Sequence, residues 1–153
     1  MPYEVRTVSE DPRPLAAVRA TTTQGQLGTD IVRLLDLVWP VLREQGAATG
    51  HNVIVYREAR DGVLTIDAGV EVPSGFTASG QVQPAATPAG QSVTTAHYGE
   101  YRELGRAYRA IERWCAEHQR QPSGLSWEVY GDWAEDPAQR RTDVYLQLRP
   151  EAG

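Results

Sequence analysis

The stretch 126–132, which reads "SWEVYGD", contains Glu128, the residue with the clearest potential for chemistry. Trp127, Val129 and Tyr130 surround it, and residues of these types favour β-strands. Aromatic ring faces attract positive charge, and a carboxylate that is partly removed from water attracts it more strongly. A glutamate in this setting is therefore typical of a cation-binding site. The alternative is an exposed strand residue that pairs with an arginine, and the residue types alone leave this alternative open.

Metal and nucleophilic chemistry have little support elsewhere in the chain. His51, His97 and His118 share no metal-ligand spacing with one another or with Cys115, the single cysteine. Cys115 lies on an apolar helix stripe, which favours a buried, inert thiol over a nucleophile. His97 follows a strand pattern and is expected to make structural hydrogen bonds. We therefore predict neither a metal site nor a cofactor.

The composition is that of a soluble globular domain. The chain has 153 residues, of which 41% are hydrophobic and 23% charged. The net charge of -5 argues against direct binding of nucleic acid. No apolar run approaches the roughly 20 residues that span a bilayer, and the N-terminus does not resemble a signal peptide. We expect one cytoplasmic domain over residues 1–153 that binds neither nucleic acid nor membrane.

Two segments have the apolar periodicity of amphipathic helices. The first covers residues 31–42, with Gly46 expected at its end and Pro40 expected to kink it or cut it short. The second begins near Tyr101, and its apolar stripe includes Tyr108. The opposite side of this second helix is predicted to be a solvated charged face. Its members are Arg102, Arg106, Arg109, Glu112 and Arg113.

Strand patterns surround both helices, and the order strand, helix, hairpin occurs twice. Asp61-Gly62 predicts a tight turn in the first hairpin. A shift of 74 places "VIVY" (53–56) on "WEVY" (127–130). We therefore predict an α+β fold of duplicated strand-helix-hairpin modules that form an antiparallel sheet, with helices on one face and a ligand groove between the halves. The pseudo-repeats are about 14–72 and 91–149, and 73–91 is expected to connect them.

Strand alternation assigns the side chains to faces. Trp127 and Val129 share one face of their strand, whereas Glu128 and Tyr130 share the other. Because each helix has one apolar stripe, we expect the helices to cover the Trp and Val face. The residues expected beneath the helices are Val53, Val55, Trp127 and Val129. The residues expected on the opposite face, lining the groove, are Tyr56, Asp67, Glu71, Glu128, Tyr130 and Tyr145.

Several segments together resemble the gyrase-inhibitor-like (GyrI-like) effector-binding family. They are "HYGEYREL" (97–104), "SGLSWEVYGDWAEDP" (123–137), "TDVYLQLRP" (142–150) and the hairpin end "AGVEVP" (68–73). The resemblance implies a central groove that binds drug-like, often cationic, lipophilic molecules. The glutamate of the family motif faces that groove and matches Glu128, and the tyrosine of the motif matches Tyr130. Trp133 and Tyr101 are expected either to line the groove or to pack elsewhere.

The resemblance also implies several contexts in bacteria. Members are often the effector half of transcription regulators, and others modulate DNA gyrase or sequester toxins and drugs, which links the family to multidrug binding and antibiotic resistance. A subgroup hydrolyses reactive cyclopropane-bearing compounds. The chain begins at the first strand of the module, so no helix-turn-helix domain is expected.

We therefore expect a stand-alone protein, not an enzyme, that binds small hydrophobic, cationic or planar molecules. Two alternatives stay open. One is a hydrolase in which Glu128 acts as general base or positions water, with tyrosines as donors. The other is an interaction protein that modulates gyrase. A protein partner or a homodimer is compatible with each of these readings.

Overall fold

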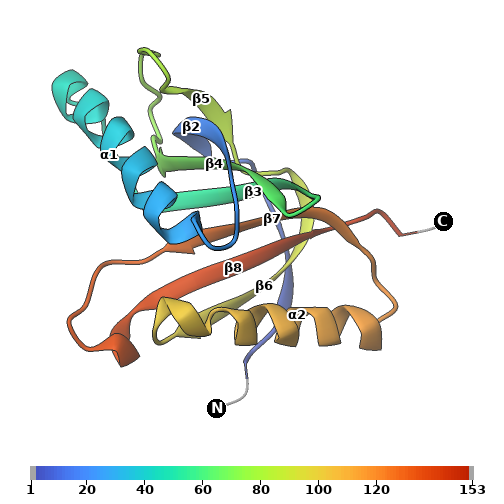
Figure 1. Ribbon diagram of the computed structural model, residues 1–153. Helices are drawn as coiled ribbons and strands as arrows, with labels where there is room; N and C mark the ends of the chain where they lie inside the picture. Colours follow the sequence, from blue (N-terminus) through green and yellow to red (C-terminus); the bar gives the residue numbers. More distant parts are fainter. Residues whose placement is uncertain (1–2, 152–153) are drawn as a thin grey trace. The chain divides into compact units, whose positions relative to one another are not determined.

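The computed structural model describes residues 3–151, which contain eight β-strands and two α-helices (Figure 1). The chain forms two compact units. The first unit is Pro12–Thr87, and the second unit combines residues 1–11 with Pro88–Gly153. Strand pairing inside each unit is antiparallel, which confirms the predicted α+β class. No helix in the described part of the chain is long and apolar enough to cross a membrane.

The first unit has the predicted order strand, helix, hairpin, and its strands lie in the order β3-β4-β2-β5. The hairpin turns at Asp61 and Gly62, whose φ angles of 52° and 78° are those of the predicted tight turn. The segment expected to be only a connector contributes a strand that pairs with the first strand of the module. The elements are β2 (Pro14–Thr22), α1 (Leu27–Gln45), β3 (Asn52–Arg60), β4 (Val63–Glu71) and β5 (Gln83–Ala86).

Helix α1 packs on β2 and β4 through Leu34, Val38 and Leu42, all of which are buried. It ends at Gly46, as predicted, where a φ of 61° is left-handed and suits glycine. Pro40 does not cut the helix short, because α1 continues through this residue. Buried side chains on both sides of Pro40 hold the helix against the sheet, and this packing outweighs the backbone hydrogen bond that proline cannot make.

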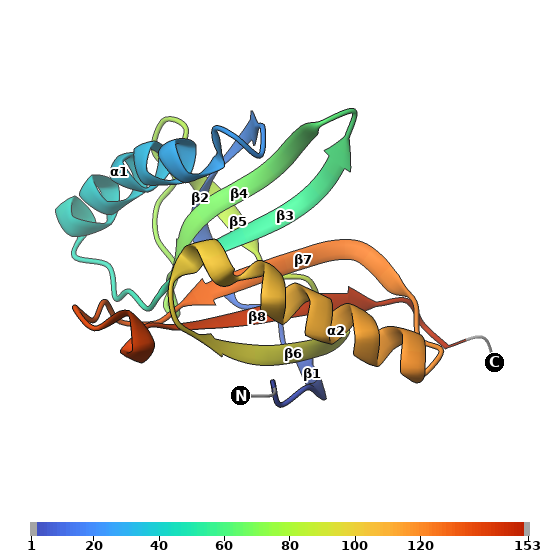
Figure 2. The ribbon, with the colours of Figure 1, turned by 60° about the horizontal axis from the view of Figure 1, so that its bottom comes forward.

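The second unit repeats this order, with its strands arranged as β1-β6-β8-β7. Helix α2 packs on β6 and β8 and is seen crossing them in Figure 2. The core between the helix and the strands includes Ile111 of α2 and Val93, Val144 and Leu146 of the strands. The elements are β1 (Arg6–Glu10), β6 (Gly90–Tyr98), η1 (Tyr101–Glu103), α2 (Gly105–Glu117), β7 (Pro122–Tyr130), η2 (Pro137–Gln139) and β8 (Arg141–Leu148).

The predicted faces of β7 are wrong. Residues directly opposite in an antiparallel pair share a face, and Glu128 lies opposite the core residue Val144. Glu128 and Tyr130 therefore point to the side of α2. Trp127 lies opposite Tyr145 on the other side, and the two rings stack with centroids 4.9 Å apart. Trp127 is buried, but not beneath the helix.

The same reversal occurs in the first unit. Asn52 accepts a hydrogen bond from Trp39 of α1, so its side chain faces the helix. Tyr56, four residues later on the same strand, shares that face. Val53 and Val55 are fully buried, but they point away from α1, and Val55 lies opposite Asp67.

The reversal has a physical cause in the packing of the helices. Helix α2 buries its apolar stripe against β6 and β8, and α1 buries its stripe against β2 and β4. The strands that carry Val55 and Trp127, β3 and β7, are not among those that make the main helix contacts, so their most apolar positions need not face the helix. The assumption that each helix covers the apolar face of every strand in its module therefore fails.

Candidate ligand-binding site

Glu128 is a buried carboxylate, with 4% of the residue exposed, and it is held by two tyrosine hydroxyls. Tyr108 of α2 donates to Oε2 over 2.5 Å, and Tyr130 of β7 donates to Oε1. The ring of Tyr101, from η1, meets Tyr130 edge-on with centroids 5.6 Å apart. We call these four residues the Glu128 cluster. Two elements, α2 and β7, thus hold the carboxylate, and η1 packs against the tyrosine from β7.

Each member of the Glu128 cluster is placed by a simple feature of its element. Glu128 and Tyr130 are two residues apart on β7, so strand alternation puts them on one face. Tyr108 belongs to the buried side of α2 and packs against the core with its hydroxyl directed at the strand. Tyr101 precedes α2 and is 39% exposed, so it connects the cluster to the surface.

The electrostatics of the cluster follow from burial. A carboxylate removed from water is costly unless its oxygens are hydrogen-bonded. The hydroxyls of Tyr108 and Tyr130 meet this need without neutralising the negative charge. Tyrosine rings also present faces that attract cations. The arrangement is therefore suited to hold a positively charged or polarised group beside Glu128.

Two residues predicted for the site lie elsewhere in the second unit. Tyr145 is buried on the sheet face opposite Glu128, stacked on Trp127. Trp133 follows β7 and is 66% exposed, with the guanidinium of Arg140 lying 3.7 Å from the centre of its ring. The structure brings neither residue to the Glu128 cluster.

The predicted site residues of the first unit lie on opposite faces of its sheet. Tyr56 is on the side of α1, whereas Glu71 is on the side of Asp67. Glu71 accepts hydrogen bonds from the backbone N–H of His51, over 2.9 Å, and from the guanidinium of Arg13, over 3.3 Å. The expectation that Tyr56, Asp67 and Glu71 share one face is therefore wrong.

The predicted structural role of His97 is confirmed. The residue is 2% exposed, its Nδ1 lies 2.8 Å from the hydroxyl of Tyr3, and its Nε2 lies 3.0 Å from the carbonyl oxygen of Glu100. Cys115 is also buried, as predicted, and burial raises the pKa of its thiol. Within residues 3–151, no group of three or more His, Cys, Asp or Glu side chains is placed to hold a metal ion.

The residue that sequence reasoning missed is Tyr108. The helical periodicity places it on the apolar stripe of the second helix, and it does pack against the core. A signal was present, because a tyrosine on a buried stripe needs an acceptor for its hydroxyl. Glu128 follows in the strand after that helix. Pairing the two would have indicated that Glu128 faces the helix.

The comparisons with known proteins agree with this fold. The chain matches the GyrI-like small molecule binding domain over residues 1–149. The chain belongs to the GyrI-like family. This confirms the resemblance found in the sequence and identifies the domain as one that binds small molecules. No curated protein matches the chain.

Several solved structures share the GyrI-like fold. The C-terminal domain of EcmrR is 17% identical with a TM-score of 0.77, and the match covers 97% of this chain and 99% of that one. A hydrolase from Listeria innocua is 10% identical with a TM-score of 0.64, covering 95% and 92%. SAV2435 bound to tetraphenylphosphonium is 11% identical with a TM-score of 0.61, covering 97% and 94%.

Proposed function

We propose that this GyrI-like domain binds lipophilic cations and that the Glu128 cluster supplies the negative charge that selects them. The observation that carries the proposal is the buried Glu128 carboxylate, held by the hydroxyls of Tyr108 and Tyr130. Charge attraction grows as water is excluded, so this carboxylate favours a cation more than a surface glutamate would. The tyrosine rings add cation–π attraction and contact area for flat apolar groups.

The comparisons support a ligand of this class. The family is one of small-molecule binding domains, and the related protein SAV2435 has been solved with tetraphenylphosphonium, a lipophilic cation. Tyr101 is partly exposed beside Tyr130 and gives a ligand a first aromatic contact at the surface. The contributions of Tyr56, Glu71, Tyr145 and Trp133 to binding stay predictions, as do the cytoplasmic location and a role in regulation.

Two probes of the same shape and opposite charge test the proposal. Tetraphenylphosphonium and tetraphenylborate both carry four phenyl rings around one charged centre. We expect the phosphonium ion to bind in the micromolar range, about -8 kcal/mol, and the borate ion to bind at least about tenfold more weakly. The four tryptophans of the chain give a fluorescence signal for the titration. Equal affinity for the two ions would show that apolar burial alone drives binding.

Hydrolysis is a second candidate function. A carboxylate beside two tyrosine hydroxyls is able to position a water molecule and to donate to a leaving group. One protein of the same fold is described as a hydrolase. If Glu128 acts as a base on a reactive substrate, Glu128→Gln abolishes turnover while substrate binding stays nearly intact. If the domain only binds its ligand, the same substitution weakens binding of the cation, and neither the wild-type protein nor the variant forms a product.

A further inference from the structure

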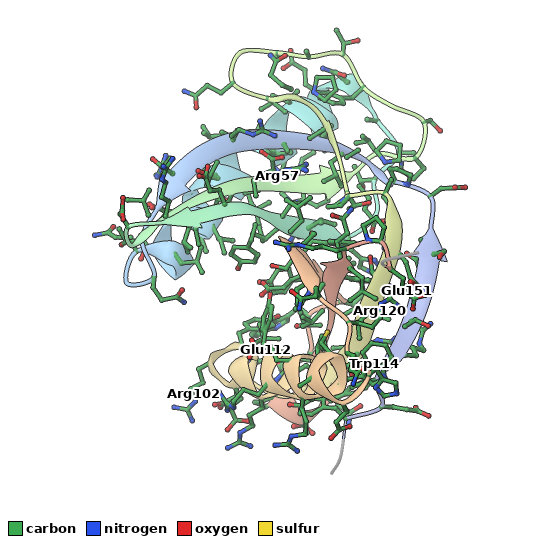
Figure 3. All side chains as sticks on the ribbon, turned by 90° about the vertical axis from the view of Figure 1, so that its right-hand side faces the viewer. Arg57, Arg102, Glu112, Trp114, Arg120 and Glu151 are labelled. Atoms are coloured by element: carbon green, nitrogen blue, oxygen red, sulfur yellow. The ribbon has the colours of Figure 1, made fainter. Side chains whose placement is uncertain are left out.

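A row of arginines runs along α2 on the side away from its core. Arg106, Arg109 and Arg113 follow one another at helical spacings, and Arg102 extends the row by one turn. These spacings put Arg106, Arg109 and Arg113 on one face of α2, whereas Arg102 belongs to the short helix η1 that precedes it. Figure 3 shows Arg102 and Trp114 at opposite ends of the helical segment. The net charge of the protein is -5, so the row is a local concentration of positive charge on an acidic molecule.

A groove of about 560 Å³ lies along this row, within the second unit. The N-terminal segment forms one wall and α2 forms the other, with an aromatic ring on each. Trp114 is half-buried and stacks on His118, with ring centroids 4.1 Å apart. We call this feature the arginine groove. Its principal lining residues are Tyr3, Arg106, Arg109, Arg113, Trp114 and Glu117.

The positive charge of the groove is only partly neutralised. Arg106 lies 3.7 Å from a carboxylate oxygen of Glu103, and Arg102 pairs with Glu100. Arg109 and Arg113 form no ion pair with any residue between 3 and 151. Two neighbouring guanidiniums are therefore available to an external partner.

The arginines are also poorly placed for the stability of α2. This helix has no acidic residue in its first turn and no side-chain cap at its N-terminus. Arg106 lies in that first turn, where the helix dipole favours negative charge. Like charges three or four residues apart on a helix repel each other. Since neither effect helps the helix to fold, the row is better explained by an interaction outside it.

We propose that the arginine groove is a docking site for an acidic peptide segment of a protein partner. Carboxylates of the segment pair with Arg109 and Arg113, and an apolar side chain packs between Tyr3 and Trp114. Nucleic acid is disfavoured, because Glu117 lies in the groove and the protein as a whole is acidic. The proposal does not rest on ligand binding at Glu128.

Fluorescence anisotropy with a defined peptide tests the docking site. The probe is a fluorescein-labelled peptide of repeated Glu-Leu-Glu-Ser units, and its uncharged counterpart has Gln in place of Glu. We expect the acidic peptide to bind the wild-type protein at low ionic strength and the uncharged peptide to bind at least about tenfold more weakly. The double variant Arg109→Glu/Arg113→Glu should also bind the acidic peptide at least about tenfold more weakly than the wild-type protein does.

The matched control is Arg33→Glu/Arg60→Glu, which changes the net charge by the same amount in the first unit. Both residues are exposed and lie outside the groove. This control should retain most of the affinity, because neither residue lines the groove that holds the peptide. Three outcomes overturn the proposal: no binding of the acidic peptide, equal weakening in the two double variants, or tighter binding of an oligothymidine that Arg109→Glu/Arg113→Glu abolishes. The last result would assign the groove to nucleic acid.

Discussion

The buried carboxylate of Glu128 is stabilised by the two tyrosine hydroxyls that donate to it, and a substitution of Tyr108 tests this stabilisation. Tyr108→Phe keeps the ring in the core but removes one donor to a buried carboxylate. We expect the free energy of unfolding to fall by about 1–2 kcal/mol, measured by urea denaturation. The control is Thr142→Val, since Thr142 Oγ1 is buried and has no hydrogen-bond partner within the described chain. Thr142→Val should leave stability unchanged or raise it. A loss as large as that of Tyr108→Phe would contradict this account.

Asp67 is a second buried carboxylate, and its partners are arginines. Arg19 donates to both of its oxygens over 2.8 and 3.0 Å, and Arg57 donates over 2.9 Å. Burial alone would raise the pKa of Asp67, but the hydrogen bonds and charges of the two guanidiniums outweigh it, and the pKa lies below its ordinary value. Arg57 also donates to the carbonyl of Ala86, so the group ties β3 and β4 to β5. Asp67 is thus a structural anion of the first unit.

The lowered pKa of Asp67 predicts how stability depends on pH. The ionised carboxylate favours the folded state above its unfolded pKa of about 3.9. This contribution is lost as the pH falls through that value toward the lower folded pKa. We expect Asp67→Asn to cost about 3 kcal/mol at pH 7, and the difference from wild type to shrink between about pH 5 and pH 3. Urea denaturation across this pH range measures both effects.

The control for Asp67 is Asp143→Asn in the second unit. Asp143 pairs with Arg141 over 2.8 Å, but the side chain of Asp143 is 26% exposed, against 2% for Asp67, so the pair should be worth less than about 1 kcal/mol. If Asp143→Asn and Asp67→Asn cost the same, burial does not determine the strength of the two ion pairs.

At the scale of elements, the end of α1 gives a prediction from backbone geometry. Gly46 has a φ of 61°, and an alanine there would be strained by about 1 kcal/mol. Gly28 lies in the first turn of the same helix, and a Cβ added there would meet no atom within 4 Å. We expect Gly46→Ala to lower the urea midpoint and Gly28→Ala to keep or raise it. The opposite order of the two midpoints would contradict the assigned cap.

Helix ends and tight turns could be predicted from the sequence, whereas the face of a strand that meets a helix could not. Gly46 ends its helix and Asp61-Gly62 turns its hairpin because these conformations need particular residues. The periodicity of Trp127 and Glu128 established correctly that they lie on opposite faces of β7. It did not say which face meets α2, because helix packing depends on the neighbouring strands β6 and β8. Face assignments within a repeat therefore need tertiary information.

For the whole molecule, the duplicated order of elements and the α+β class were predictable from the sequence. The candidate site was predictable in part. Glu128, Tyr130 and Tyr101 do come together, but Tyr108 was missed, and Trp133 and Tyr145 lie apart from the cluster. Strand alternation fixes neighbours along one strand, whereas partners from a helix depend on how that helix packs. The part of the site that comes from α2 could not be obtained from periodicity alone.

If the charge of Glu128 selects the ligand, removing that charge should weaken a cationic ligand and spare a neutral one. Isothermal titration calorimetry with tetraphenylphosphonium and with neutral triphenylphosphine oxide is carried out on the wild-type protein and on Glu128→Gln. The substitution keeps the shape of the side chain and removes its charge. We predict that it weakens binding of the phosphonium ion by about 1.5–3 kcal/mol, or roughly 10- to 150-fold. The affinity for the neutral ligand should change by less than about twofold. Unchanged phosphonium affinity in Glu128→Gln would contradict the account.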